Sequence, residues 1–230
     1  MQRVDCVLFD LDGTLVESAP EIADAVNDLL TAQGLAAVSE ELVAAWIGHG
    51  TSELMAQAWA HATGVTRAQL RSDDVLQRLM PRFAEFYARR CGSRSRLYPT
   101  VRETLQELRA RGVRCAVVTN KEQRYTAQLL LAHQIRHYFD VVVSGDSLAA
   151  KKPDPLPVRY SLDALQVAPS HALFVGDSEI DVATARAAGL RVWTVPYGYN
   201  MGRPIAEAGP DRVIPTLDAL LAVDDQQCAA

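Results

Sequence analysis

The chain has 230 residues, of which 49% are hydrophobic and 22% are charged, and its formal net charge is −5. This composition excludes a disordered chain and allows one large core, or a core with a smaller satellite domain. The negative charge provides no general attraction to nucleic acid or to acidic membranes, so we expect neither as a partner.

The cysteines and the first residues predict a reduced, cytoplasmic protein. No two cysteines form a C-x-x-C motif, which argues against a zinc site or a disulfide framework. The first apolar run is too short for a signal peptide and ends in aspartates, and no segment is long enough to cross a bilayer. The cysteines are Cys6, Cys91, Cys115 and Cys228.

The first predicted element is a buried strand over residues 4–9 that ends in Asp10 and Asp12, followed by Gly13. Ligands bind at the carboxyl ends of strands in open parallel sheets, and alternate residues point the same way. Both carboxylates can therefore face one crevice, while Leu11 turns back to the core. The competing interpretation is an ordinary Asp-Gly turn.

Residues from about 20 to about 90 carry apolar side chains at helical spacing and no convincing strand. We interpret this segment as a helical insertion after the first strand, with hinges at 15–19 and at the polar, irregular 91–99. The expected division is a cap domain of residues 16–95, hinges included, and a catalytic core of residues 1–15 and 96–230. The position of the insertion near the active edge of the sheet suggests a lid.

After residue 95, short apolar runs bounded by turn formers alternate with helix-like stretches. Such alternation is typical of a parallel doubly wound sheet, and Gly112 and Gly189 stand where helix C-caps are expected. The predicted fold is α/β, a Rossmann-like doubly wound parallel sheet core with an inserted helical cap. The expected strands are 113–118, 139–143, 172–175 and 192–195, and the expected helices are 101–111, 125–132, 156–165 and 180–188.

Polar side chains follow the later strands, namely Thr119, Asn120, Lys152 and Asp177. In a parallel sheet they meet the first-strand aspartates, and carboxylates about 4 Å apart repel by roughly 4 kcal/mol at a dielectric near 20. Such a cluster requires a cation, and oxygen ligands favour Mg²⁺. Lys152 and the Thr119 hydroxyl then match the oxygens of a phosphate.

This set of groups suits phosphoryl transfer. Asp10 can attack phosphorus as a nucleophile, and Asp12 can protonate the leaving oxygen and later accept a proton from water. Each residue also has a plainer explanation. Lys152 could belong to a solvated pair with Lys151, and Thr119 could only cap a helix. Two acids follow the strand expected at 172–175: Asp177 could be an N-cap, and Asp181 could be a first-turn acid stabilised by the helix dipole.

The ordered segments D-L-D-G-T (10–14), T-N-K (119–121), K-P-D-P (152–155) and G-D (176–177) leading to Asp181 resemble the four motifs of the haloacid dehalogenase superfamily. The resemblance covers nearly the whole chain. It implies Asp10 as nucleophile, Asp12 as general acid and base, and phosphate contacts from Thr119 and Lys152. It also implies Mg²⁺ bound by the Asp10 carboxylate, the Asp12 carbonyl and Asp177, with Asp181 in support.

Within that superfamily the chain is most similar to phosphoglycolate phosphatases, on segments 10–20, 46–50, 118–121 and 197–200. This implies hydrolysis of 2-phosphoglycolate, a small phosphate ester, by a monomer or homodimer. Asn120 and the loop of Gly48, His49 and Gly50 are candidate substrate contacts. The departures from the family pattern are Glu17 in place of aspartate, Thr100 where glycine is frequent, and His49 where asparagine is frequent.

Other functions remain open at this point. A sugar-phosphate phosphatase or a phosphomutase of the same superfamily would share the residues, the mutase passing the phosphoryl group to a sugar hydroxyl. A dehalogenase would have no use for Asp12 or the metal site. A signalling receiver also joins acids, a threonine and a lysine around Mg²⁺, but it lacks an insertion such as residues 20–90.

Overall fold

The computed structural model describes residues 4–66, 69–70 and 74–223, so Cys228 lies outside the described residues. Its centre is a six-stranded sheet in the order β5-β4-β1-β6-β7-β8, in which every neighbouring pair is parallel. The chain builds outward from β1 on one side and then crosses to β6 on the other. The switch point of this doubly wound topology therefore lies between β1 and β6, where ligands are expected. The strands are β1 (Cys6–Phe9), β4 (Arg114–Val118), β5 (Val141–Val143), β6 (Ala172–Gly176), β7 (Arg191–Thr194) and β8 (Arg212–Val213).

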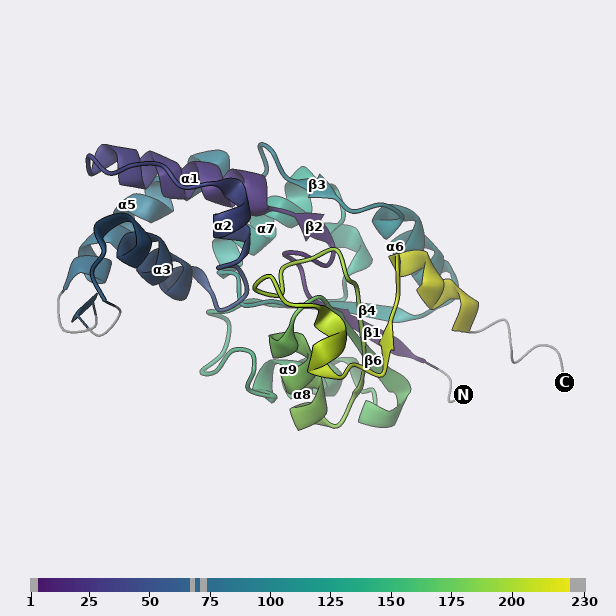
Figure 1. The fold of residues 1–230 in the computed structure, drawn as a ribbon. Coiled ribbons are helices and arrows are strands. Elements are labelled where there is room, and N and C mark those ends of the chain that lie inside the picture. Colours follow the sequence, from purple (N-terminus) through teal and green to yellow (C-terminus); the bar gives the residue numbers. More distant parts are fainter. Residues whose placement is uncertain (1–3, 67–68, 71–73, 224–230) are drawn as a thin grey trace, which may run out of the picture.

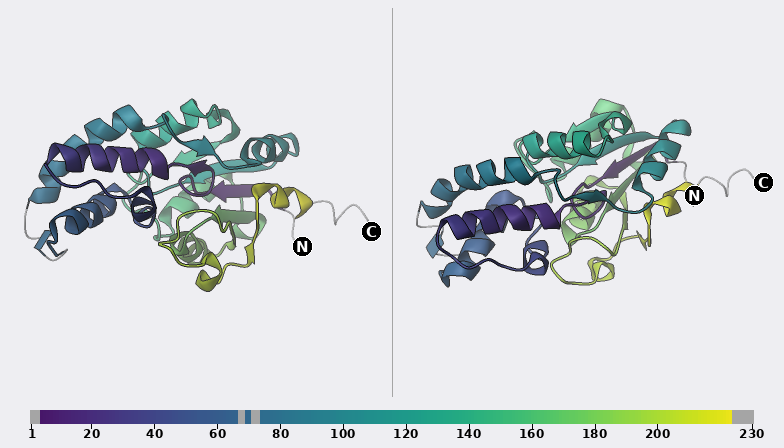
Figure 2. Two further views of the ribbon diagram at one scale, coloured as in Figure 1. Left: turned by 45° about the horizontal axis from the view of Figure 1, so that its top comes forward. Right: turned by 90° about the horizontal axis from the view of Figure 1, so that it is seen from above.

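Helices cover both faces of the sheet (Figures 1 and 2). Alternate β1 residues enter two different clusters: Cys6 and Leu8 join the one that contains α8 and α9, whereas Val7 and Phe9 join the one that contains α6 and α7. Burial on both faces explains why β1 is apolar throughout. The helices are α6 (Val101–Ala110), α7 (Gln123–Ala132), α8 (Leu156–Leu165) and α9 (Glu179–Ala188), with short 3₁₀ turns η1 (Arg136–Tyr138), η2 (Pro169–His171), η3 (Ile205–Ala208) and η4 (Leu217–Val223).

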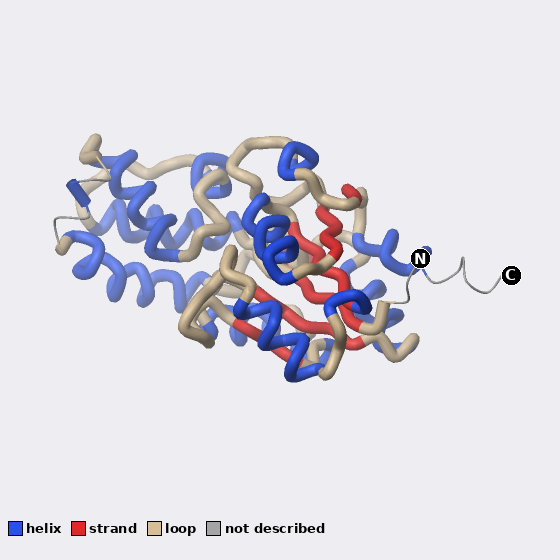
Figure 3. Tube along the Cα trace, turned by 90° about the horizontal axis from the view of Figure 1, so that it is seen from below, coloured by secondary structure: helices blue, strands red, loops and turns tan. Residues whose placement is uncertain are grey.

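The described residues between 19 and 90 are largely helical, and this helical segment lies at one end of the molecule, apart from the strands of the main sheet (Figure 3). It contains α1 (Ala19–Ala32), α2 (Glu40–Ala44), α3 (Thr51–Thr63) and α5 (Val75–Arg90). The long α1 packs against both α2 and α5 through apolar residues spaced three or four apart. No described helix has the length and apolar character that a bilayer crossing requires.

Where the chain leaves β1 and where it returns, two short strands pair in an antiparallel ribbon, β2 (Val16–Glu17) with β3 (Arg96–Leu97). The expectation of an irregular 91–99 segment was therefore wrong at β3. Next to the ribbon, one buried oxygen of Glu21 on α1 accepts backbone hydrogen bonds from Gly92 at 2.8 Å and Ser95 at 3.0 Å. These bonds connect the start of the helical segment to its end.

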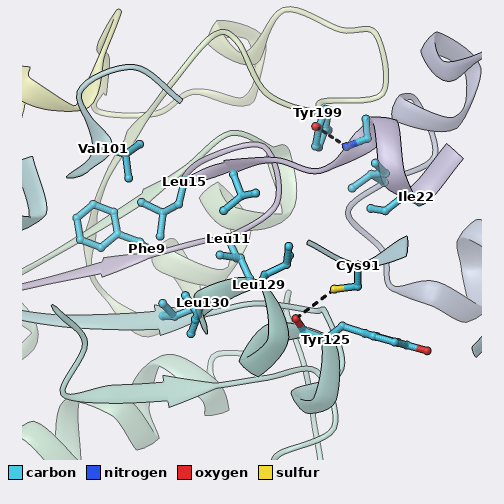
Figure 4. Close-up of a cluster of buried hydrophobic side chains, with 14 of the residues drawn as sticks. Phe9, Leu11, Leu15, Ile22, Cys91, Val101, Tyr125, Leu129, Leu130 and Tyr199 are labelled. Atoms are coloured by element: carbon cyan, nitrogen blue, oxygen red, sulfur yellow. Dashed lines mark hydrogen bonds between the residues drawn. The ribbon is translucent and has the colours of Figure 1, made fainter. Parts of the chain in front are cut away.

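The predicted α/β fold is confirmed, and the expected strands and helices lie within two residues of their observed bounds. Below the loop of aspartates, Leu11 and Leu15 point into an apolar cluster with Phe9 and Leu129 (Figure 4). Each fully buried leucine contributes about 1.5 to 3 kcal/mol of transfer free energy. The packing of Leu11 and Leu15 therefore holds the loop that carries Asp10 in place.

Candidate active site

Asp10 and Asp177 follow neighbouring strands, β1 and β6, at the switch point of the sheet. Together with Asp181 from the first turn of α9 they form a buried acidic cluster, in which one carboxylate oxygen of each residue lies within 4.8 Å of the others. Lys152 Nζ donates to Asp10 Oδ1 and to Asp181 Oδ1, both at 2.7 Å. The structure therefore brings together three parts of the chain that are far apart in the sequence: Asp10, Lys152 and the neighbouring pair Asp177 and Asp181.

The buried carboxylates of the acidic cluster repel one another, and the Lys152 ammonium offsets this repulsion only in part. Burial raises the pKa of Asp10 to about 7, against the opposing effect of the Lys152 ammonium, and Asp181 raises it further by repulsion. Burial and the charges of Asp181 and Asp10 raise the pKa of Asp177 well above its usual range. Burial lowers the pKa of Lys152, but the two carboxylates outweigh it and keep this lysine charged.

Asp177 is held by the protein from two sides. Thr14 Oγ1 donates to Asp177 Oδ1 at 2.7 Å, and the backbone N–H of Tyr199 donates to Oδ2. A Cβ at Gly13 or at Gly198 would lie 2.3 Å from Asp177 Oδ2, so glycine is required at both positions. Gly13 also has φ +91°, which favours glycine.

Asp181 has a structural task as well as its place in the cluster. Its Oδ2 accepts from the backbone N–H groups of Asp177 and Ser178 at 3.1 and 3.0 Å, and from Ser178 Oγ at 2.7 Å. This is a capping box at the start of α9, with Ser178 rather than Asp177 as N-cap. Asp181 can therefore cap α9 and belong to the acidic cluster at the same time.

Asp12 faces the same cavity as Asp10 but has different partners. Ser18 Oγ donates to Asp12 Oδ1 at 2.5 Å, and Lys121 Nζ donates to Oδ1 at 3.1 Å and to Oδ2 at 3.0 Å. Lys121 was not among the predicted site residues, although it directly follows Thr119 and Asn120. Burial lowers the pKa of Lys121, but Asp12 outweighs it and holds the pKa above its usual value.

A cavity separates these aspartates from the helical segment. Its polar floor consists of Asp10, Asp12, Thr119, Asn120 and Lys121, and its opposite wall is mostly apolar. The side chains of the helical segment on this wall are Ile22, Ile47, Thr51, Leu54, Phe83 and Tyr87. Thr119 is buried on the floor, where its Oγ1 accepts from the Lys121 N–H at 3.2 Å.

Two of the three residues predicted as substrate contacts in the 48–50 loop line the cavity. Gly48 and Gly50 line it, whereas His49 is not among its lining residues and instead accepts a hydrogen bond at its carbonyl from Lys151 Nζ at 2.9 Å. The side-chain amide of Asn120 donates to the carbonyls of Gly48 and Lys152, both at 3.0 Å. Asn120 therefore connects the loop to the segment that carries Lys152.

Comparison with known proteins is consistent with this geometry. The family model described as haloacid dehalogenase-like hydrolase matches residues 7–195. A phosphoglycolate phosphatase of Nitrosospira multiformis is 42% identical over 214 residues, covering 93% of this chain and 92% of the relative. A phosphoglycolate phosphatase of Haemophilus influenzae is 42% identical over 215 residues, covering 94% of this chain and 96% of the relative.

Solved structures show the same fold. The crystal structure of a predicted phosphoglycolate phosphatase from Haemophilus somnus matches with a TM-score of 0.90 at 36% identity, covering 97% of this chain and 99% of that one. CbbY from Rhodobacter sphaeroides, solved in complex with phosphate, matches with a TM-score of 0.73 at 28% identity, covering 94% and 96%. With its sheet order, its acidic cluster and these relatives, the chain belongs to the haloacid dehalogenase-like hydrolases.

Proposed function

We propose that this protein is a Mg²⁺-dependent phosphatase that converts 2-phosphoglycolate to glycolate and phosphate through an aspartyl-phosphate on Asp10. The observation that carries the proposal is that Asp10 both lines the cavity and belongs to the acidic cluster, and is hydrogen-bonded to Lys152 at 2.7 Å. The names of the relatives in Nitrosospira multiformis and Haemophilus influenzae support the choice of substrate.

The residues fit a hard divalent cation. The cluster offers only oxygen ligands within 4.8 Å of one another, and burial with mutual repulsion raises the pKa of Asp10 and of Asp177. In our proposal the Asp10 carboxylate, the Asp12 main-chain carbonyl and Asp177 bind Mg²⁺, and Asp181 supports the site. Bound Mg²⁺ would neutralise charge on the phosphoryl oxygens.

The protein side chains then divide the chemistry. An Asp10 oxygen forms a bond to phosphorus while the bond from phosphorus to the leaving oxygen breaks, and Asp12 gives that oxygen a proton. Asp12 then takes a proton from the water that attacks the aspartyl-phosphate and regenerates Asp10. Lys152 and the Thr119 hydroxyl stabilise the phosphoryl charge, and Asn120 fixes the loop that closes one side.

The shape of the site supports a small ester. Gly48 and Gly50 line the cavity, and the Gly48 carbonyl accepts a hydrogen bond from the floor residue Asn120 at 3.0 Å, so the loop backbone lies close to the floor. We propose a division into a cap of residues 16–95, hinges included, and a core of residues 1–15 and 96–230. It is supported by the cavity, because Ile22, Phe83 and Tyr87 face the catalytic aspartates across it.

We also propose a cytoplasmic location, supported by three buried cysteines that are free: Cys6, Cys91 and Cys115. Burial raises the pKa of each thiol to about 12, which keeps these cysteines unreactive.

A panel of phosphate esters in Mg²⁺ tests the function. We expect the highest kcat/KM for 2-phosphoglycolate, with phosphate and glycolate as products. Higher kcat/KM for a sugar phosphate would remove the substrate assignment, and isomerised sugar phosphate without free phosphate would indicate a mutase. A phosphorylated protein that persists without releasing phosphate would indicate a receiver.

A further inference from the structure

Lysine is rare in this chain, and its few positions are informative. The sequence has three lysines, Lys121, Lys151 and Lys152, against 20 arginines. All three lie near the carboxyl edge of the sheet: Lys152 contacts Asp10, Lys151 contacts the His49 carbonyl, and Lys121 lines the cavity. A lysine in such a place provides a compact charge on a flexible stem, which can follow a small anion.

Lys121 is the one cation among the described residues that line the cavity. An ammonium has three N–H donors, and the hydrogen bonds of Lys121 Nζ to described residues all go to the Asp12 carboxylate. The Nζ atom also lies 4.8 Å from the centroid of the Tyr87 ring, which comes from α5 on the opposite side. The ammonium therefore stands at the boundary between the catalytic floor and the apolar wall, with donor capacity remaining.

Asp10 and Asp12 on the cavity floor have different lysine partners. Lys152 donates to Asp181 and to Asp10, which bonds to phosphorus in the proposed function. Lys121 donates instead to Asp12, the proposed proton donor to the leaving oxygen. A group attached one or two atoms beyond that oxygen would face Lys121, with Ile22 and Phe83 on the wall.

We propose that Lys121 is a specificity-determining residue that binds a carboxylate on the leaving-group side of the substrate. The inference rests on the proposed function and deepens it. An anion against Ile22 and Phe83 loses its hydration and needs a cation in return, and Lys121 is the cation available there. A neutral leaving group gains nothing from Lys121, so this residue discriminates carboxylate esters from neutral esters of the same shape.

The test compares 2-phosphoglycolate with 2-amino-2-oxoethyl phosphate, in which a neutral amide replaces the carboxylate and the phosphate is kept. Lys121→Gln removes the charge but keeps a donor for Asp12, and Lys121→Met removes both. We expect the ratio of the two kcat/KM values to fall about 100-fold in either variant, as for loss of one partner of a buried charge pair. The control Arg124→Met removes an exposed cation on α7 and leaves the ratio unchanged.

Equal losses for both substrates in Lys121→Gln would overturn the inference, because Lys121 would then act only through Asp12. Isothermal titration with glycolate gives a second measurement that needs no turnover: weaker binding to Lys121→Gln than to wild type supports the inference, and equal binding overturns it. Absence of hydrolysis by the wild type would instead defeat the proposed function. The glycolate titration still decides the role of Lys121 in that case.

Discussion

Lowering the pH from about 8 to about 6 is expected to weaken Mg²⁺ binding by about tenfold, because a proton then competes for Asp10. The pKa of Asp10 is raised to about 7 by burial and by its acidic neighbours. The free carboxyl is therefore about nine-tenths ionised at the higher pH and about one-tenth ionised at the lower. The pKa of Asp177 is raised too, which increases the effect in the same direction.

The assay is isothermal titration of the protein with Mg²⁺ at both pH values, without substrate. Asp10→Asn serves as the matched control: its binding is weaker throughout, and its pH dependence is flatter because the titrating group is gone. A Kd for Mg²⁺ that is the same at both pH values in the wild type would refute the reasoning. The acidic cluster would then not be the metal site.

Thr100 and Tyr199 each give a prediction about stability. Thr100, just before α6, has φ 66°. Thr100→Gly is therefore expected to relieve backbone strain, stabilise the fold by about 1 kcal/mol and raise Tm by about 2 to 4 °C. A lower Tm would contradict this. The Tyr199 hydroxyl accepts the N–H groups of Ser18 and Ala19 at 3.0 and 2.9 Å. Tyr199→Phe should therefore cost about 1 to 3 kcal/mol in denaturant unfolding, whereas Tyr160→Phe, at a side chain that is 50% exposed, should cost nothing measurable; equal effects would count against the argument.

The positions of Asp10 and Asp12 after β1 could be predicted because the signal for them is local. An apolar run that ends in D-x-D-G reports both a buried strand and its polar end, and the same holds for Thr119 and Asp177. The helix over 156–165 was likewise predicted from the local sequence alone, and its observed bounds are the same. The strands β2, β3 and β8 were not predicted, since two residues each are too few to show a period.

The partners of these residues depend on distances that sequence spacing does not contain. Thr119, Asn120 and Lys121 are consecutive, and only the folded turn shows that the Asn120 amide donates to the Gly48 carbonyl while Lys121 reaches Asp12. Tyr199 lies in the loop after β7, and only the fold shows that its backbone N–H donates to Asp177. Thr100 stands where the family frequently has glycine, and the positive φ of this residue explains why glycine is favoured there.

The most direct test of the central claim is phosphate release from 2-phosphoglycolate in Mg²⁺ by the wild type and by Asp10→Asn. The side chain of Asp10 is buried and its neighbour Lys152 stays in place, so the variant is expected to keep the fold by circular dichroism. We predict a loss of phosphate release of at least about 10⁴-fold, since an amide cannot form the aspartyl-phosphate. Release by Asp10→Asn within about tenfold of the wild type would show that Asp10 is not the nucleophile.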